Sequence, residues 1–427
     1  MPITEHDSEL GRRVEQFARE AHRENGNGKS MVYPSNPLWR RMRELGTELW
    51  LDSGDIEAIS EVWAPEFTGL TTNNTLLNHE IQKGSYDELI ETAARLLEDY
   101  PLLSADERKL EIAFILNTHH ALRLVERFGA YVSVEEHTNL TEDLEGTINY
   151  ARRFRALCPD RFYVKIPFSA AGLLATRRVS GEEIAINHTL GFSARQNYVV
   201  ARIARPAFVN VFLGRLNSFI TDNDLGSGAH VGERATLASQ AAIRKLRRER
   251  GISTRQIAAS LREGRQVADL AGVDVITMPP KVAKEFLNLG IEPQDLRDRT
   301  EEAFDLRVKE AHAEAIGLES LWEIHDGLLA CVDALEQERL EMFTPVRLRG
   351  FCQRHGCGDV LVQWTDSQVK ASAEEGKIPS LASWKEELAD RRVGLDSLMS
   401  LAGWNSFRDD QEALDQRVEE IMASARK

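Results

Sequence analysis

Between about residues 38 and 290, amphipathic helical stretches alternate with short apolar runs rich in Val, Ile, Phe and Leu. Eight of these runs have the length of strands, and a segment with a helical pattern separates each run from the next. Parallel strands need helical crossovers, and eight such strands can close into a barrel. The pattern therefore predicts an α/β fold, a (β/α)8 TIM-type barrel, with strands at 47–52, 66–71, 130–136, 162–167, 183–187, 207–213, 254–260 and 273–278.

Two regions lie outside this alternation. The first 35 residues are polar and contain Asn25-Gly26-Asn27-Gly28, so we expect a short helix and a linker there. After about residue 320 the chain is rich in Glu and Leu, which predicts helices that pack against the barrel or against a second subunit of a homo-oligomer. We divide the chain accordingly into a leader (1–35), a barrel (36–319) and a helical C-terminal extension (320–427).

Polar residues follow four of the apolar runs, at the carboxyl ends where barrels carry their chemistry. The first run ends in Asp52, the second in 71–73, the third in Glu135, and the fifth, Ile184-Ala185-Ile186, in 187–189. Such residues also cap helices, a role that Asp, Asn and Thr often have. Four strand ends with compatible chemistry nevertheless favour a site on one rim of the barrel.

Lys165 lies inside the fourth apolar run, which ends at Pro167. Burial disfavours the charged ammonium, and a neutral amine can attack a carbonyl group. A lysine on a strand often reaches the surface or pairs with a carboxylate instead. In the company of the polar strand ends, Lys165 is a candidate for a Schiff-base nucleophile.

Two arginines, Arg215 and Arg262, follow the sixth and seventh runs. Arginine donates paired hydrogen bonds to phosphate, and late-strand loops hold phosphate in many barrels, although a solvated salt bridge is the alternative for each arginine. The net charge of −15 argues against general affinity for nucleic acid or anionic membranes. A local basic pocket for a small phosphorylated metabolite fits both observations.

Other features exclude further classes. No apolar stretch approaches the roughly 20 residues that span a bilayer, and the charged start lacks a signal peptide, so we expect a cytoplasmic protein. Four cysteines are too few for a disulfide framework in 427 residues. Cys352, His355 and Cys357 offer three zinc ligands within six residues, but a structural site normally needs four, so we expect no metal there.

Taken in chain order, these segments resemble the transaldolase family. The resemblance covers about residues 36–290 and rests on an ordered series of motifs rather than on any single one. The motifs lie at Trp50–Asp55, Gly69–Asn73, Val132–Glu135, Val164–Pro167, Asn187–Ser193, Phe212–Arg215, Ala259–Arg262 and Leu270–Pro279.

The resemblance implies a class I transaldolase of the pentose phosphate pathway, without metal or cofactor, that moves a dihydroxyacetone unit from a ketose phosphate to an aldose phosphate. Lys165 would form the Schiff base with the ketose C2 carbonyl. Asp52 would transfer the proton of the C4 hydroxyl, and Glu135 with Thr189 would position a water molecule. The substrate contacts implied are Asn73 and Asn187 for hydroxyls and the enamine, Asn210 for a hydroxyl, and Arg215, Ser260 and Arg262 for the phosphate.

Three departures from the family pattern lie at the expected substrate cleft. After the Lys-Ile-Pro motif the family usually has Ala or Met followed by Thr, whereas this chain has Phe-Ser-Ala-Ala-Gly at 168–172. In addition, Asn74 replaces a proline, and Asn210 stands where a serine is common. All proposed charged groups are kept, which favours altered substrate preference over lost activity. Two alternatives stay open: an aldolase that releases free dihydroxyacetone or uses an unusual sugar phosphate, and a silent barrel whose C-terminal helices bind a protein. Glu135 favours transfer, because the free-aldolase branch tends to have an uncharged residue there.

Overall fold

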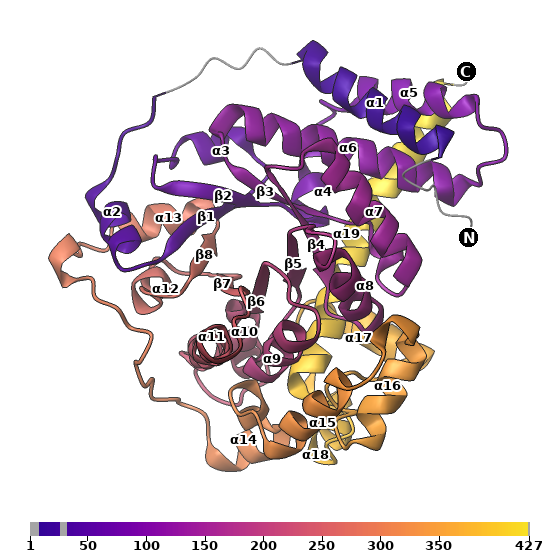
Figure 1. Ribbon diagram of the computed structural model, residues 1–427. Coiled ribbons are helices and arrows are strands. Elements are labelled where there is room, and N and C mark those ends of the chain that lie inside the picture. The colour runs from indigo at the N-terminus through magenta and orange to yellow at the C-terminus, as the bar shows by residue number, and fades with distance from the viewer. Residues whose placement is uncertain (1–7, 26–31, 426–427) are drawn as a thin grey trace.

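The computed structural model describes residues 8–25 and 32–425. Within these residues eight parallel strands follow one another around a closed barrel, and β1 pairs with β8 to complete the ring (Figure 1). The predicted (β/α)8 barrel is confirmed. The strands are β1 (Glu48–Asp52), β2 (Phe67–Thr71), β3 (Tyr131–Glu135), β4 (Phe162–Pro167), β5 (Ile186–Thr189), β6 (Phe208–Phe212), β7 (Arg255–Ala259) and β8 (Val275–Met278).

Helices surround the barrel and continue beyond it as the predicted C-terminal helices (Figure 1). Those up to the last strand and its crossover are α1 (Glu9–Asn25), α2 (Pro37–Glu44), α3 (Ile56–Ser60), α4 (Asn74–Gln82), α5 (Asp87–Glu98), α6 (Ala105–Phe128), α7 (Leu144–Leu157), α8 (Ala170–Ser180), α9 (Ala194–Ile203), α10 (Leu213–Asp222), α11 (Val231–Arg250), α12 (Gly264–Asp269) and α13 (Pro280–Leu287). The later ones are α14 (Glu310–Ile316), α15 (Asp326–Glu336), α16 (Pro345–Arg354), α17 (Asp366–Glu375), α18 (Leu381–Ala389) and α19 (Leu395–Ala425). Short 3-10 helices are η1 (Thr138–Leu140), η2 (Pro293–Asp295), η3 (Leu318–Leu321) and η4 (Leu340–Met342).

The fifth strand begins later than the sequence pattern predicts. Glu183 and Ile184 belong to the turn that ends α8, since Glu183 has a φ of 60° and the Ile184 amide donates to the Val179 carbonyl at 3.1 Å. The predicted bounds of 183–187 are therefore wrong, because the apolar Ile184 packs in a turn rather than in the sheet. As a result, 187–189 form the strand itself instead of the loop after it.

Side chains alternate between the two faces of each strand, and those that point into the barrel fill its interior below the carboxyl ends with aromatic rings. Trp50 stacks on Tyr163 with ring centroids 5.5 Å apart and meets Phe208 edge-on at 4.9 Å. Gly69 permits this packing, since a Cβ atom there would lie 2.6 Å from the Trp50 ring. Asp52 lies two residues after Trp50 and therefore on the same face of β1. The packed layer thus forms a floor beneath the carboxyl ends of the strands.

The strand register brings chemically active residues side by side near the carboxyl ends of the strands. Glu135 on β3 is the register partner of Lys165 on β4, and Lys165 is the partner of Asn187 on β5. Asp52 on β1 is the partner of Thr71 on β2. Register partners in neighbouring strands point to the same face of a sheet. One register row therefore carries a carboxyl group, a lysine and an amide on β3, β4 and β5, and a second row begins with the Asp52 carboxylate on β1.

The C-terminal extension is fastened to the barrel by ion pairs, of which that between Arg195 and Asp396 is buried. Arg195, at the start of α9, binds Asp396 of α19 through two nitrogens at 2.8 and 2.7 Å and binds Asp359 at 2.7 Å. Arg202, further along α9, pairs with Asp333 and Glu336 of α15. The helix α19 continues alongside α4, α5 and α6, across the carboxyl side of the barrel (Figure 1). The extension thus adds a layer on the rim that carries the polar strand ends.

The leader also contacts the barrel. Val14 and Ala18 of α1 are fully buried, and α1 packs against α6. Residues 26–28 of the predicted linker lie outside the described residues.

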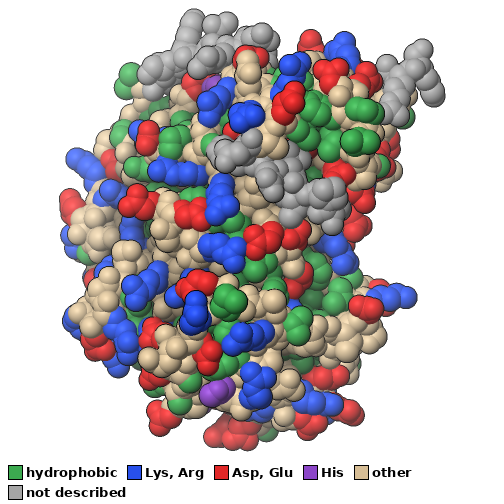
Figure 2. Space-filling view, turned by 45° about the vertical axis from the view of Figure 1, so that its right-hand side comes forward, with side chains coloured by type: hydrophobic (Ala, Val, Ile, Leu, Met, Phe, Trp, Pro, Cys, Tyr) green, Lys and Arg blue, Asp and Glu red, His purple; other side chains and the backbone are tan. Residues whose placement is uncertain are grey.

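The helices of the described residues include none with the length and apolar character needed to cross a membrane. On the face shown in Figure 2, acidic and basic side chains are interspersed. That face has no broad basic area of the kind that binds nucleic acid.

Candidate active site

One cavity opens at the carboxyl rim of the barrel, and most residues singled out in the sequence line it. The structure brings together nine of the ten predicted site residues as cavity lining: Asp52, Asn73, Lys165, Asn187, Thr189, Asn210, Arg215, Ser260 and Arg262. Glu135 is the exception, since it lies beside Lys165 without lining the cavity.

Lys165 is the basic group at the base of this cavity. It lies near the carboxyl end of β4 and is only 4% exposed. The Nζ atom donates a hydrogen bond to the Thr72 carbonyl oxygen at 2.5 Å. A neutral acceptor holds the amine in place without forming an ion pair with it, so the geometry is compatible with a nucleophilic amine.

Glu135 supplies a buried carboxyl group next to this amine. Burial raises the pKa of Glu135, while Lys165 and a hydrogen bond from the Asn74 amide, at 3.1 Å, lower it by less. The nearby charge of Asp52 raises it further. A carboxyl group with a raised pKa can exchange protons closer to neutral pH than an ordinary glutamate.

Asp52 is held by a chain of hydroxyl groups. Thr71 donates to its Oδ1 at 2.7 Å, and the hydroxyls of Thr71 and Thr277 lie 2.8 Å apart. These three residues come from β1, β2 and β8, which are neighbours in the barrel. The contacts fix one carboxylate oxygen and leave the group at the cavity wall.

A chain of amides occupies the opposite wall. Asn187 donates to the Ser133 hydroxyl at 3.0 Å and accepts from Asn210 at 2.8 Å. Within the described residues, Asn210 Oδ1 and Thr189 Oγ1 are buried polar atoms without a hydrogen-bond partner. Buried polar atoms are nearly always satisfied, so such atoms beside a cavity are suited to bind hydroxyl groups of a ligand or water.

Arg215 and Arg262 form the cationic side of the cavity. Arg215 is 5% exposed, and burial, followed by the charge of Arg262, lowers the pKa of its guanidinium to about 10. Gly214 lets the two loops meet, because a Cβ atom there would lie 2.1 Å from the carbonyl oxygen of Ser260. Ser260 itself has a φ of 64°, a left-handed conformation that bulky residues rarely adopt. Two adjacent arginines that repel each other are suited to share a dianion.

Asn73 has a local role besides its place in the cavity. Its Oδ1 accepts from the Leu76 amide at 2.8 Å and so caps α4. The helix-capping alternative weighed for strand-end residues is therefore realised here, at a residue that also lines the cavity.

Several residues that line the cavity had no role assigned from the sequence. Thr71 falls within the polar strand end 71–73 but was given no contact of its own, and period-two alternation could have indicated Thr277. Lys377 and Phe407 come from the C-terminal extension, and no local pattern marks them. Phe407 lies near Arg215, with the guanidinium carbon 5.5 Å from the ring centroid.

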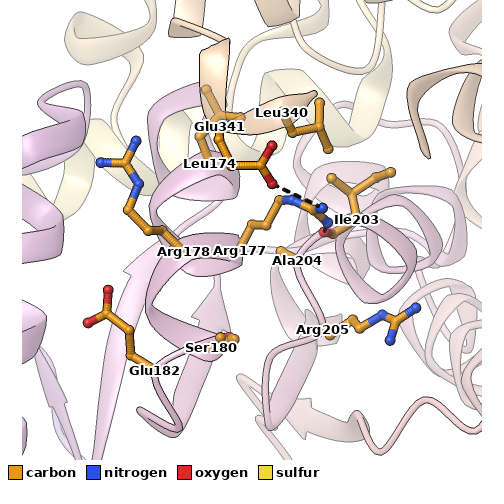
Figure 3. A pocket seen from close by; sticks show the side chains of 11 residues that line it. Leu174, Arg177, Arg178, Ser180, Glu182, Ile203, Ala204, Arg205, Leu340 and Glu341 are labelled. Carbon is orange, nitrogen blue, oxygen red and sulfur yellow. Dashed lines mark hydrogen bonds and ion pairs between the residues drawn. The ribbon is translucent and has the colours of Figure 1, made fainter. Parts of the chain in front are cut away.

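A second hollow lies outside the barrel, between the ends of α8 and α9 (Figure 3). It contains three arginines, of which Arg177 pairs with Glu341 at 3.6 Å and Arg178 pairs with Glu145 at 2.8 Å. Its lining includes neither a lysine nor a cysteine. The rim cavity is therefore the better candidate for covalent chemistry.

The described residues contain no group of three or more His, Cys, Asp and Glu side chains placed to hold a metal ion. Cys352, His355 and Cys357 are described and do not form such a group. The thiols of Cys331, Cys352 and Cys357 are buried in the C-terminal extension.

Glu136, next to Glu135, carries a stability prediction. The residue is 4% exposed, and burial, with help from Asp143 and Glu135, raises its pKa well above the ordinary value. Between the unfolded and folded pKa values the unfolded chain loses this proton while the folded protein keeps it, so stability falls as pH rises. We expect Glu136→Gln to raise the free energy of unfolding by about 1 kcal/mol or more at pH 8 and to have little effect near pH 4.

Urea unfolding of both proteins across this pH range measures the effect. Glu249→Gln, at an exposed position on α11, is the matched control and should leave the pH dependence unchanged. A constant difference between Glu136→Gln and the unmodified protein at all pH values would contradict the prediction.

Fold and cavity together define a barrel protein with amine, carboxyl and guanidinium groups at its carboxyl rim, and comparison with known proteins agrees with this class. Residues 49–344 match the family model for transaldolase/fructose-6-phosphate aldolase. A probable transaldolase of Thermus thermophilus is 32% identical over 243 residues, which are 56% of this chain and 90% of that protein. A transaldolase of Protochlamydia amoebophila is 27% identical over 56% of this chain and 74% of its own length. A transaldolase of Xanthomonas euvesicatoria is also 27% identical, over 58% of this chain and 76% of its own length.

The chain therefore belongs to the transaldolase/fructose-6-phosphate aldolase family. The resemblance that the sequence motifs indicate is confirmed. The family match ends at residue 344, so most of the C-terminal extension lies beyond it.

Proposed function

We propose that the protein is a transaldolase that moves a dihydroxyacetone unit from a ketose phosphate to an aldose phosphate through a Schiff base on Lys165. The observation that carries the proposal is the position of this lysine. It is buried at the carboxyl end of β4, in register with Glu135, and shares a cavity with Asp52 and the two arginines. Family membership supports the same class of activity.

Schiff-base formation begins when the Lys165 amine attacks the C2 carbonyl of the ketose. The resulting carbinolamine loses water and leaves an iminium ion, which requires one proton to reach the departing hydroxyl. Glu135 is suited to this transfer by its raised pKa, and Thr189 offers an unpartnered hydroxyl for a bridging water molecule.

Carbon–carbon cleavage then uses the iminium as the electron sink. Asp52 takes the proton of the C4 hydroxyl, the C3–C4 electron pair moves toward the iminium, and an aldose phosphate leaves. The three-carbon fragment remains on Lys165 as an enamine. Transfer reverses these steps: the enamine carbon attacks the acceptor aldehyde, Asp52 returns its proton to the new hydroxyl, and hydrolysis frees the product.

The other polar groups fit recognition of the donor sugar. Asn73 lines the cavity from the end of β2, and Asn187 and Asn210 line it from the neighbouring strands β5 and β6. These amides suit the hydroxyl groups and the enamine fragment. Arg215, Ser260 and Arg262 suit the phosphate, since paired guanidinium groups bind it through charge-assisted hydrogen bonds.

Release of free dihydroxyacetone, the aldolase alternative, would use the same lysine. The glutamate at position 135, beside Lys165, favours the transferase. Measuring product in the presence and absence of an acceptor aldose phosphate separates the two activities: a transferase needs the acceptor for turnover, and an aldolase does not.

Borohydride trapping with fructose 6-phosphate tests the proposal directly. Reduction of the enzyme during incubation, followed by intact mass and peptide mapping, should reveal a three-carbon adduct on Lys165. Such an adduct requires both imine formation and retention of the cleaved fragment. If folded protein gives no adduct with this or other ketose phosphates, the proposed reaction is wrong for these substrates, and a silent barrel becomes the better interpretation.

A further inference from the structure

The C-terminal extension contributes two side chains to the candidate active site. Lys377, in the loop between α17 and α18, and Phe407, in α19, line the same cavity as Lys165. Both lie beyond residue 344, where the family match ends. This part of the cavity is therefore a feature of the present chain that its barrel does not supply.

The loop that carries Lys377 is fixed to the barrel and to its own helix. Asn223, at the end of α10, donates to the Pro379 carbonyl at 3.1 Å and accepts from the Leu381 amide at 2.7 Å. Glu375 accepts hydrogen bonds from the Ser380 amide at 3.0 Å and from the Trp384 side chain at 2.8 Å. Three of these hydrogen bonds hold the backbone on the carboxyl side of Lys377, and the fourth joins Glu375 to α18 through a side chain.

The residue on the other side of Lys377 is fixed by its backbone angles. Gly376 ends α17 with φ 77° and ψ −142°, a region that is almost restricted to glycine. The chain therefore turns sharply before Lys377, and this turn places the lysine at the cavity. A fixed backbone reduces the entropy that an anchoring side chain loses on binding.

The Lys377 ammonium is available for a ligand. The residue is exposed, and among the described residues no carboxylate lies within ion-pair distance of it. Lys370, seven residues earlier on α17, instead pairs with Glu374 at 3.9 Å and is 78% exposed. Lys377 thus differs from a nearby surface lysine in both its location and its lack of a partner.

The charges around the cavity favour an anionic ligand. Besides the nucleophile Lys165, its lining carries three basic side chains, Arg215, Arg262 and Lys377, and one carboxylate, Asp52. The chain as a whole has a net charge of −15. A cleft lined by one sign of charge concentrates ligands of the opposite sign, even on a protein whose net charge opposes them.

We propose that Lys377 binds the phosphate end of the sugar phosphate at the cavity and so sets the preference for phosphorylated substrates. This inference rests on the function proposed above. Arg215 is buried beneath Phe407, which limits the directions from which it can approach a phosphate. Lys377 combines a long, flexible side chain with a fixed backbone, so its ammonium can reach the same phosphate from the side of the extension.

Steady-state kinetics of Lys377→Gln tests the inference. We expect KM for fructose 6-phosphate to rise about tenfold, with kcat within about twofold, because a charge-assisted contact to the substrate is lost. Lys377→Arg should stay within about threefold of the unmodified KM, since it keeps the charge. Lys370→Gln is the matched control in the same extension and should behave as the unmodified enzyme.

Two outcomes would overturn the inference. The first is an unchanged KM in Lys377→Gln, and the second is an equal rise of KM for unphosphorylated fructose, which would indicate a structural defect. Calorimetric binding of inorganic phosphate needs no turnover and separates this inference from the proposed reaction. Weaker phosphate binding by Lys377→Gln supports the role of Lys377 even if Lys165 forms no adduct, and equal binding overturns it even if Lys165 does.

Discussion

Lys165→Met is expected to lower turnover by at least about 10⁴-fold, since loss of the nucleophile removes the covalent intermediate itself. Methionine keeps an unbranched side chain that reaches as far as the lysine Cε and so keeps the packing at the end of β4, while it removes the amine. The Thr72 carbonyl loses one hydrogen bond, at a cost of about 1 kcal/mol of stability. The variant should therefore remain folded and form no adduct on borohydride reduction.

Circular dichroism and urea unfolding check that Lys165→Met is folded, and coupled assays measure its turnover. Lys281→Met, at a position on α13 whose side chain is 83% exposed, is the control for loss of a lysine charge. Surviving turnover in folded Lys165→Met would exclude the transferase and the aldolase alike, because both need the same amine.

Asp52→Asn is expected to separate imine formation from carbon–carbon cleavage. The amide keeps an oxygen for the Thr71 hydroxyl, which donates at 2.7 Å in the structure, but it no longer takes the C4 hydroxyl proton. We expect turnover to fall by about 10³-fold, within the range for loss of a general base. The Schiff base should still form, so reduction should trap the intact six-carbon sugar on Lys165 in place of the three-carbon fragment.

Intact mass distinguishes the two adducts of Asp52→Asn directly. Asp222→Asn, an exposed carboxylate at the end of α10, serves as the matched control and should yield the three-carbon adduct. A three-carbon adduct formed by Asp52→Asn at the unmodified rate would show that another group removes the proton.

Much of the fold can be predicted from the sequence because the strands of this barrel are buried on both faces. Such strands form short apolar runs, as around Val164, that differ clearly from the amphipathic helices between them. The error at the fifth strand has the same origin. Ile184 is apolar and β-branched, yet it packs in the turn that ends α8, and composition alone does not separate a buried turn from a strand.

The candidate site was predictable where it depends on strand ends and not where it depends on tertiary contact. Asp52 and Lys165 end or nearly end their strands, so the barrel topology alone places them on one rim. Lys377 and Phe407 reach the cavity only because the extension folds back over that rim, and Arg195 must find Asp396 about 200 residues away to hold it there. Contacts over such separations leave no periodic pattern in the sequence.

The buried pairing of Arg195 with Asp396 has a consequence for the order in which the protein matures during synthesis. Domains fold from the N-terminal side as the chain emerges at about 5–20 residues per second, so the last strand of the barrel leaves the ribosome on the order of ten seconds before Phe407. During that interval Arg195 has no carboxylate from α19, and Arg215 lacks the ring of Phe407. A nascent barrel therefore has its nucleophile before it has its complete cavity, and we expect full activity to appear only after α19 has docked.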